Sequence, residues 1–303
     1  MHTTPLAVFF AISRTPASMC SAGILIFLIA LWAARADLAK ARGLDKIVAL
    51  RNLCFAMPLA VFGALHISAA KDLMPMVPKY IPWHLFWAYF FGFALIAASL
   101  SIATKILVQW SGLLFGIAMF SFVAMLIIPG VVATPNDRFG WTLIFREGSF
   151  GGGAWILAGS AMRERGRGQW GSKLIRVGRV LIGMACLLYG VEHFLHPANV
   201  PGVPLEKFMP AWIPGHAAIA YVTGALLLIA GVFILLNKKT RMAATYLGTW
   251  IVLLVLFVYG PILIASLMDP SAAVQIEGID YFFDTLLFGG TILVLASASP
   301  RAD

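Results

Sequence analysis

The sequence predicts an all-α integral membrane protein with nine transmembrane helices, arranged as one leading helix and two parallel four-helix repeats. Three observations support this class. Hydrophobic residues make up 61% of the 303 residues and charged residues 12%, and the mean hydropathy is +0.90, which excludes an ordinary soluble domain. The apolar residues form runs of membrane-spanning length, and one stretch of the chain recurs further along.

The apolar runs define the helices in order. Each has close to the roughly 20 residues that a helix needs to cross the hydrocarbon core of a bilayer. The first is the leading helix, the next four form repeat 1 and the last four form repeat 2. The runs lie near residues 17–34, 48–70, 83–103, 106–133, 141–162, 174–196, 215–236, 242–266 and 280–298.

The recurring stretch is residues 78–98, which return as residues 210–230 at a constant offset of 132. The identities include the polar pairs His84/His216 and Tyr89/Tyr221, which shared hydrophobicity does not explain, so the chain is an internal duplication. We predict a leading helix with a basic loop (1–47), repeat 1 (48–162), a basic linker (163–173) and repeat 2 (174–303). Because each repeat has an even number of helices, both should share one orientation, with their pseudo-symmetry axis along the membrane normal.

The net charge of +9 is explained by the side of the membrane on which the basic loops lie. With the N-terminus outside and the C-terminus cytoplasmic, most Lys and Arg residues fall in inner loops, above all 35–51, 163–179 and 238–241. This positive-inside pattern predicts a multi-pass protein of a bacterial-type cytoplasmic (inner) membrane, with the lipid bilayer and not nucleic acid as its partner. The first helix could instead be a cleaved signal peptide, since Ala34-Arg35-Ala36 resembles a small-x-small site. Cleavage there would leave Lys40 and Arg42 outside, so a retained helix is predicted.

Polar residues recur at the outer ends of both repeats. Ionisable side chains in hydrocarbon cost about 2.5–3.5 kcal/mol each, so we expect them to face the bundle interior and each other. Repeat 2 has additional acids, so we expect it to hold the more active pocket and repeat 1 to be partly structural. Arg146 is expected to pair across the bundle. The candidate ligand-binding residues are His66, His84 and Glu147 in repeat 1, and Glu192, His193, His216, Tyr281 and Asp284 in repeat 2.

Other interpretations of these residues remain open. The histidines could be interhelical hydrogen-bonding groups or lie among lipid headgroups. Glu192, His193, His196 and His216 could in principle assemble a metal site, and bis-histidine haem is a further alternative, but neither spacing is specific and we predict no metal. Cys20, Cys54 and Cys186 lie in different apolar helices without a C-x-x-C pair, so buried thiols are expected.

Four motifs of repeat 2 carry a resemblance. They are G-x-E-H-F-x-x-P at 190–197, P-x-W-I-P at 210–214, Y-x-x-G at 221–224, and an acid followed by L-L-F-G-G within 284–290. Together they resemble the DoxX-like family of four-helix membrane proteins. The resemblance covers 174–298 well and 48–162 more weakly, because His66 lacks the preceding acid.

The resemblance implies an accessory or anchoring subunit of a larger membrane redox complex, rather than an independent enzyme. Its outer-leaflet pocket would take a lipophilic ligand such as a quinone, whose oxygens a carboxylate and an imidazole could contact. No cofactor motif is visible in the sequence, and no catalytic residue is assigned. The alternatives are a non-catalytic membrane scaffold or lipid-binding protein and, less favoured, a small-solute transporter, for which the inner leaflet offers no polar path.

Overall fold

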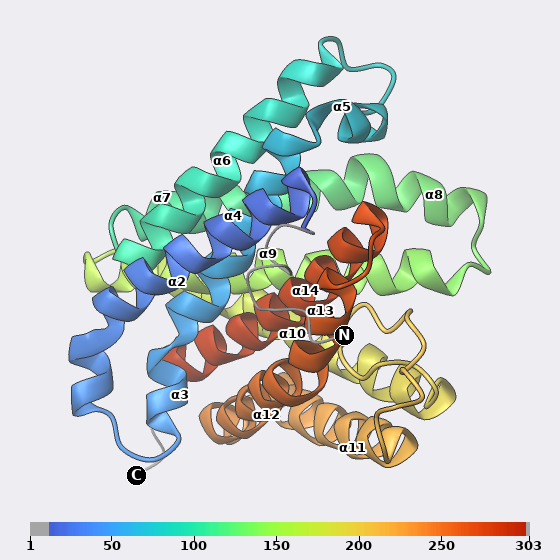
Figure 1. Cartoon of the computed structure of the whole chain (residues 1–303). Coiled ribbons are helices and arrows are strands. Elements are labelled where there is room, and N and C mark those ends of the chain that lie inside the picture. The colour runs from blue at the N-terminus through green and yellow to red at the C-terminus, as the bar shows by residue number, and fades with distance from the viewer. Residues whose placement is uncertain (1–11, 301–303) are drawn as a thin grey trace.

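The computed structural model describes residues 12–300, and this part of the chain is almost entirely helical (Figure 1). A single isolated β-bridge joins Asn199 and Phe208. The long helices are α2 (Arg14–Lys40), α4 (Arg51–Ser68), α6 (His84–Thr104), α7 (Val108–Phe122), α9 (Arg138–Glu164), α10 (Gly168–Leu195), α11 (His216–Leu235), α12 (Thr240–Leu254) and α14 (Ala272–Ala298). The short elements are α3 (Asp45–Ala49), α5 (Ala70–Leu73), η1 (Met74–Met76), the π-helical turn η2 (Val123–Ile127), α8 (Ile128–Ala133), the π-helical turn η3 (Val255–Tyr259) and α13 (Gly260–Leu267).

Seven helices in the described part of the chain are long and apolar enough to cross a membrane. An eighth span results if α4 and the segment Ala70–Met76 count together, although the chain bends by 90° between them. Helix α9 falls outside this group because Arg146, Glu147 and its many glycines lower its hydropathy. The all-α multi-pass class predicted from the sequence is therefore confirmed.

The two repeats share their backbone plan at the offset of 132 residues. Helices α6 and α11 begin at His84 and His216, each after a residue in the left-handed region, Trp83 (φ 60°) and Gly215 (φ 69°). The π-helical turns η2 and η3 are related by the same offset. The duplication seen in the sequence thus extends to the helix starts and to an irregularity inside the third helix of each repeat.

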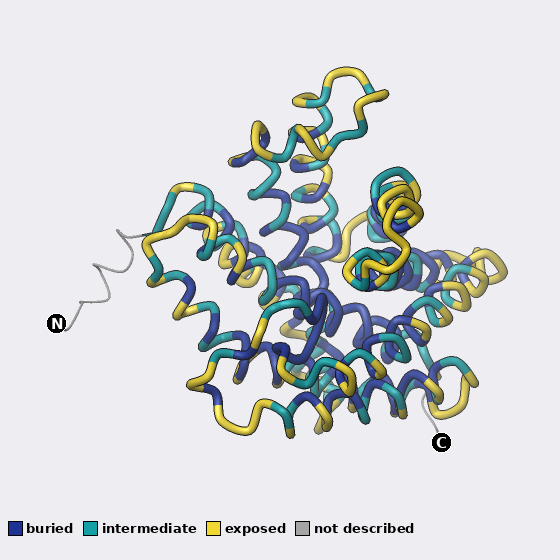
Figure 2. Tube along the Cα trace, turned by 90° about the vertical axis from the view of Figure 1, so that its right-hand side faces the viewer, coloured by how far each residue is buried: buried dark blue, intermediate teal, exposed yellow. Residues whose placement is uncertain are grey.

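The repeats pack reciprocally around two central helices. The first helix of each repeat lies along the fourth helix of the other, so α4 packs on α14 and α10 packs on α9, and α9 contacts α14 between them. Helix α14 is buried over most of its length, and buried segments fill the middle of the molecule in Figure 2. The predicted linker 163–173 is shorter in the structure, because α9 continues to Glu164 and α10 already begins at Gly168.

Glycines allow α9 and α10 to approach at backbone distance. A Cβ atom added to Gly178 would lie 2.3 Å from the carbonyl oxygen of Gly152, and one added to Gly171 would lie 2.4 Å from that of Gly159. Small residues at a helix crossing are the usual means of close packing in membranes, where apolar burial gives little drive for association. These glycines therefore hold the two repeats together.

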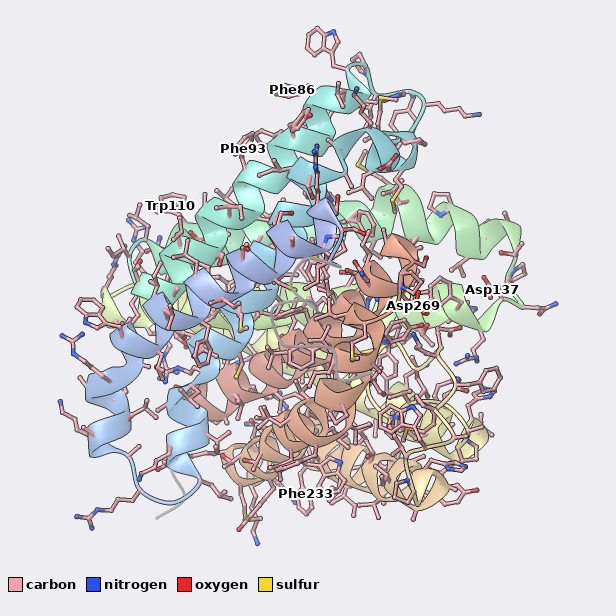
Figure 3. The ribbon with its side chains drawn as sticks, in the orientation of Figure 1. Phe86, Phe93, Trp110, Asp137, Phe233 and Asp269 are labelled. Carbon is pink, nitrogen blue, oxygen red and sulfur yellow. The ribbon has the colours of Figure 1, made fainter. Side chains whose placement is uncertain are left out.

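Large apolar side chains cover the outside of the bundle. Phe86 and Phe93 of α6 and Trp110 of α7 point away from the neighbouring helices and are 54%, 62% and 52% exposed (Figure 3). Exposed aromatic surface of this extent is disfavoured in water and is suited to contact with lipid. The lipid bilayer is thus the environment that these faces require.

Substitution of Gly178 by alanine is expected to lower the free energy of unfolding by about 1–3 kcal/mol. The added methyl group would clash with the backbone carbonyl of Gly152, which cannot shift without separating the two helices. The matched control is Gly148→Ala in α9, where an added Cβ meets nothing within 4 Å. Thermal unfolding of both variants in detergent measures the difference. Equal melting temperatures for the two variants would contradict the close-packing argument.

Candidate functional site

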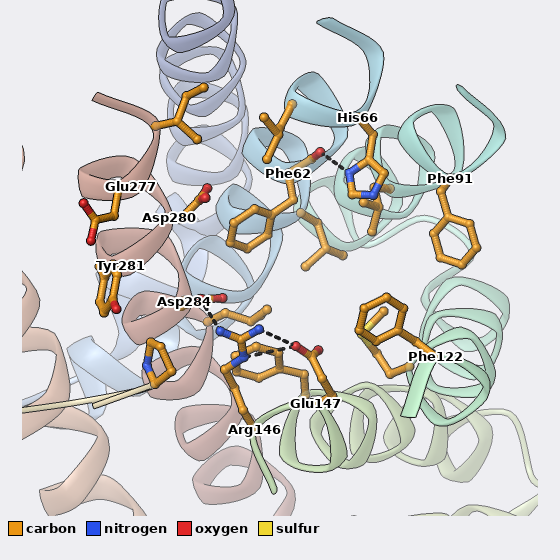
Figure 4. Close-up of a pocket in the computed structure, with 18 of the residues that line it drawn as sticks. Phe62, His66, Phe91, Phe122, Arg146, Glu147, Glu277, Asp280, Tyr281 and Asp284 are labelled. Carbon is orange, nitrogen blue, oxygen red and sulfur yellow. Dashed lines mark hydrogen bonds and ion pairs between the residues drawn. The ribbon is translucent and has the colours of Figure 1, made fainter. Parts of the chain in front are cut away.

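A cavity of about 590 Å³ lies between α4, α6, α7 and α9 of repeat 1 and α14 of repeat 2. This volume is within the range of small-molecule binding sites. Its walls are mainly apolar and aromatic, including Phe62, Phe91, Phe115, Phe122 and Phe150. One end is polar, and Figure 4 shows the charged side chains gathered there from α9 and α14. The cavity thus combines aromatic walls with a charged cluster at Arg146, Glu147 and Asp284 (Figure 4).

Arg146 joins the two carboxylates that occupy equivalent positions in the repeats. Its Nε and Nη2 donate to Oε1 of Glu147 at 3.0 and 2.7 Å, and its Nη1 donates to Oδ2 of Asp284 at 2.7 Å. The three side chains are only 10–17% exposed, so the charges are paired in a poorly solvated place where they need each other. Arg146 pairs across the bundle as expected, and it also pairs with its neighbour Glu147, although adjacent helix residues point about 100° apart.

Further polar groups of α14 line the same cavity. Asp280 lies one turn before Asp284, and its Oδ1 is buried without a hydrogen-bond partner among residues 12–300. Tyr281 also lines the cavity, with Lys207 Nζ 5.8 Å from its ring centre. Lys207 in turn pairs with Glu277, another lining residue, at 3.2 Å. Helix α14 therefore supplies carboxyl and hydroxyl groups along one wall.

His66 is the imidazole that faces this cavity (Figure 4). Its Nδ1 lies 2.8 Å from the carbonyl oxygen of Phe62, and because a carbonyl only accepts, Nδ1 carries the proton. Within the part of the chain that the structure describes, no protein group hydrogen-bonds Nε2. In the neutral ring Nε2 is thus an acceptor directed at the cavity.

In His193, the equivalent of His66, both ring nitrogens are hydrogen-bonded. Its Nδ1 donates to the carbonyl oxygen of Tyr189 at 2.6 Å, and its Nε2 accepts from the N–H of Gly202 at 3.0 Å. The side chain is fully buried beneath the loop 196–215, whose Val203 and Leu205 are also 0% exposed. The loop fills the space in front of His193, so the cavity does not lie within repeat 2 alone. It lies between the repeats, and α14 and Pro204 of repeat 2 supply part of its lining.

Glu192 takes part in a separate ion-pair network. Arg138 bridges Glu192 and Glu206, at 2.9 Å to each, and His196 lies 3.6 Å from Glu192. Burial raises the pKa of Glu206, and the positive charge of Arg138 opposes that shift. This network fastens the loop 196–215 to the start of α9 and does not line the cavity.

The remaining predicted histidines also lie outside the cavity. His84 Nε2 is 3.2 Å from the carbonyl oxygen of Pro78, and His216 is exposed at the start of α11. His84 therefore satisfies a local backbone group at the start of its helix, and neither histidine contributes to the cavity.

The structure thus gathers four of the eight predicted residues, His66, Glu147, Tyr281 and Asp284, and separates the other four. Glu277 and the phenylalanine walls were not identified from the sequence. The acidic pair could be found because it recurs in both repeats. The phenylalanines carry no comparable signal, since a residue facing a cavity and one facing lipid are equally apolar.

The alternative metal site does not assemble. Both ring nitrogens of His193 are engaged, and His216 lies on another helix facing solvent. Between residues 12 and 300 no group of three or more His, Cys, Asp and Glu side chains is placed to hold a metal ion. The three cysteines are unpaired, and Cys54 and Cys186 are buried.

No family model, curated protein or solved structure matches this chain. The similarity to the DoxX-like family stays a prediction.

Replacing Arg146 by methionine is expected to lower the free energy of unfolding by about 3–5 kcal/mol, because two buried carboxylates lose their shared counter-charge. The triple variant R146M/E147Q/D284N, which removes all three charges, should recover much of this loss. Thermal unfolding in detergent measures both. A single variant as stable as the natural chain would show that the ion pairs contribute nothing.

His193→Ala is expected to destabilise the protein by about 1–3 kcal/mol, because the buried N–H of Gly202 loses its acceptor. His216→Ala is the control, since that side chain is exposed and should be neutral. Limited proteolysis within 196–215, together with the melting temperature, reports the loosening of the loop. Equal protease resistance of the two variants would argue against this structural role of His193.

Proposed function

We propose that this chain is a multi-pass membrane protein that holds a lipophilic ligand in the repeat 1 cavity, with the polar head of the ligand at Arg146, Glu147 and Asp284. The observation that carries the proposal is the contrast within one cavity of about 590 Å³, between phenylalanine walls and a charged end. Such a shape matches a molecule with an apolar body and one polar head. Of the eight binding residues predicted from the sequence, we retain the four that line the cavity: His66, Glu147, Tyr281 and Asp284.

A quinone is the ligand class that we favour. Aromatic walls suit a flat ring, and the guanidinium of Arg146 beside two carboxyl groups suits an oxygen of its polar head. We propose the role of an accessory or anchoring subunit of a membrane redox complex, as the similarity to the DoxX-like family suggests. Electrons would come from a partner protein, and no independent catalysis is proposed.

For the topology we propose nine spans, with the N-terminus outside and the C-terminus in the cytoplasm of a bacterial-type inner membrane. Helix α9, at 27 residues, is about 40 Å long and can cross the bilayer although it is polar in part. It packs among α7, α10 and α14, so its charges are shielded from lipid. The basic loops then face the cytoplasm and the cavity opens in the outer leaflet.

Two alternatives make different predictions. A scaffold or lipid-binding protein would carry phospholipid in the cavity. A transporter would need a path through the bundle. A second cavity of about 560 Å³, lined by Arg51, Lys105 and Arg165 among others, lies at the opposite end of repeat 1. Phe55 of α4 and Ala154 of α9, located along these helices between the two cavities, are fully buried, which favours binding over transport.

The experiment is native mass spectrometry of the gently solubilised protein, with identification of the released small molecules. We expect a quinone in the natural chain and its loss in Met119→Trp, because the indole would occupy the cavity. The control is Met184→Trp, which places the same side chain on an exposed face of α10. Phospholipid alone would support the lipid-binding alternative, and equal quinone retention in both variants would contradict binding in this cavity.

A further inference from the structure

His66 and His193 hold equivalent positions in the two repeats and have the same local geometry. In both, Nδ1 bonds the carbonyl oxygen four residues earlier. Each Cβ lies against a glycine of the next helix: a Cβ added to Gly92 would be 3.1 Å from that of His66, and one added to Gly224 would be 3.0 Å from that of His193. The two imidazoles thus present Nε2 to the interiors of their repeats in the same way.

In repeat 2 the structure shows what occupies the space in front of this nitrogen. The N–H of Gly202 donates to His193 Nε2 at 3.0 Å, and the next residue is fixed by Thr285 Oγ1, which donates to the carbonyl oxygen of Val203 at 2.9 Å. The side chains of Val203 and Leu205 are fully buried. The loop therefore places a hydrogen-bond donor at the imidazole and apolar groups beside it.

In repeat 1 the corresponding connection is shorter and turns away. The offset between the repeats is 127 at His66/His193 and 132 at His84/His216, so the repeat 2 connection has five extra residues. In repeat 1 the chain instead bends by 90° after α4 and continues through α5 and η1. As a result His66 lines the cavity (Figure 4), and its Nε2 has no hydrogen-bond partner among residues 12–300.

The other polar groups of the cavity also favour a donor. Carboxyl groups come from Glu147, Asp280 and Asp284, and Asp280 Oδ1 is buried with no partner among the residues described. Among the lining residues described, the side-chain donors not bonded to backbone are Arg146, which already donates to two of these groups, and the hydroxyl of Tyr281. Acceptors therefore exceed donors, and a ligand that only accepts hydrogen bonds would leave several of them unsatisfied.

We propose that the ligand of the repeat 1 cavity donates a hydrogen bond to His66 Nε2, as Gly202 does to His193, and is therefore a hydroxyl-bearing amphiphile. Within the quinone class this means the reduced quinol in preference to the quinone. The inference rests on the proposed function, because it assigns the chemistry of the head that the same cavity takes.

The test uses the full chain in lipid nanodiscs under anaerobic conditions, with a decyl-substituted benzoquinone and its two-electron-reduced quinol as probes. The two probes share a ring and a tail and differ in their hydroxyl protons. We expect the quinol to bind at least about tenfold more tightly, corresponding to one additional satisfied hydrogen bond of about 1.4 kcal/mol. Equilibrium binding is measured against empty nanodiscs.

His66→Ala should abolish the preference by weakening quinol binding while leaving quinone binding almost unchanged. His66→Gln, whose Oε1 can accept near the position of Nε2, should retain part of it, and this variant also serves if the alanine variant folds poorly. His84→Ala is the matched control, because its imidazole bonds Pro78 outside the cavity.

The outcomes separate the two proposals. Equal affinity for both probes, with loss of both in Met119→Trp, would overturn the donor inference and leave the cavity proposal standing. A quinol preference that survives in His66→Ala would also overturn it. Failure of both probes to bind above the empty nanodiscs would overturn the quinone function and the inference together.

Discussion

The structure depends most on the way in which Arg146 neutralises two buried carboxylates. An ionised acid in a membrane bundle needs a partner at close range, and Glu147 and Asp284 share one guanidinium with contacts of 2.7 Å to each. Because the two acids come from equivalent positions of the repeats, their pairing fixes α9 against α14 at the centre of the molecule. The same charges form the polar end of the cavity, so the interaction that joins the repeats also defines the site.

The duplication has produced two bundles with one plan and different interiors. Five extra residues in the repeat 2 connection allow a loop to enter, and its buried Val203 and Leu205 replace the space that a ligand would need. Repeat 1 has the shorter connection and keeps its cavity. Unfilled space is unfavourable in a packed interior. The interior of repeat 2 is filled by its own loop, whereas the cavity beside repeat 1 is of a size that a small molecule from the bilayer could fill.

This division explains why polar residues with similar sequence surroundings have different roles. His193 accepts from a backbone amide and stabilises the loop, whereas His66 lines the cavity and its Nε2 has no hydrogen-bond partner among residues 12–300. Glu192, which strengthens the motif of repeat 2, belongs to the network of Arg138 that fastens the loop. Glu192 of repeat 2 thus supports closure of that repeat, whereas Asp280 and Asp284 of α14 line the cavity between the repeats.

The sequence by itself determined the membrane class and the duplication, which depend on composition and on identities at the offset of 132. It also determined the recurring acids, which align once small length changes between the repeats are allowed. Glu147 and Asp284 could be paired in this way before any contact was known. Only the tertiary structure decided which histidine faces a cavity, because that depends on the path of a loop between two helices. It also decided which phenylalanines form the walls, since a side chain facing lipid and one facing a cavity satisfy the same hydrophobic requirement and leave the same pattern in the sequence.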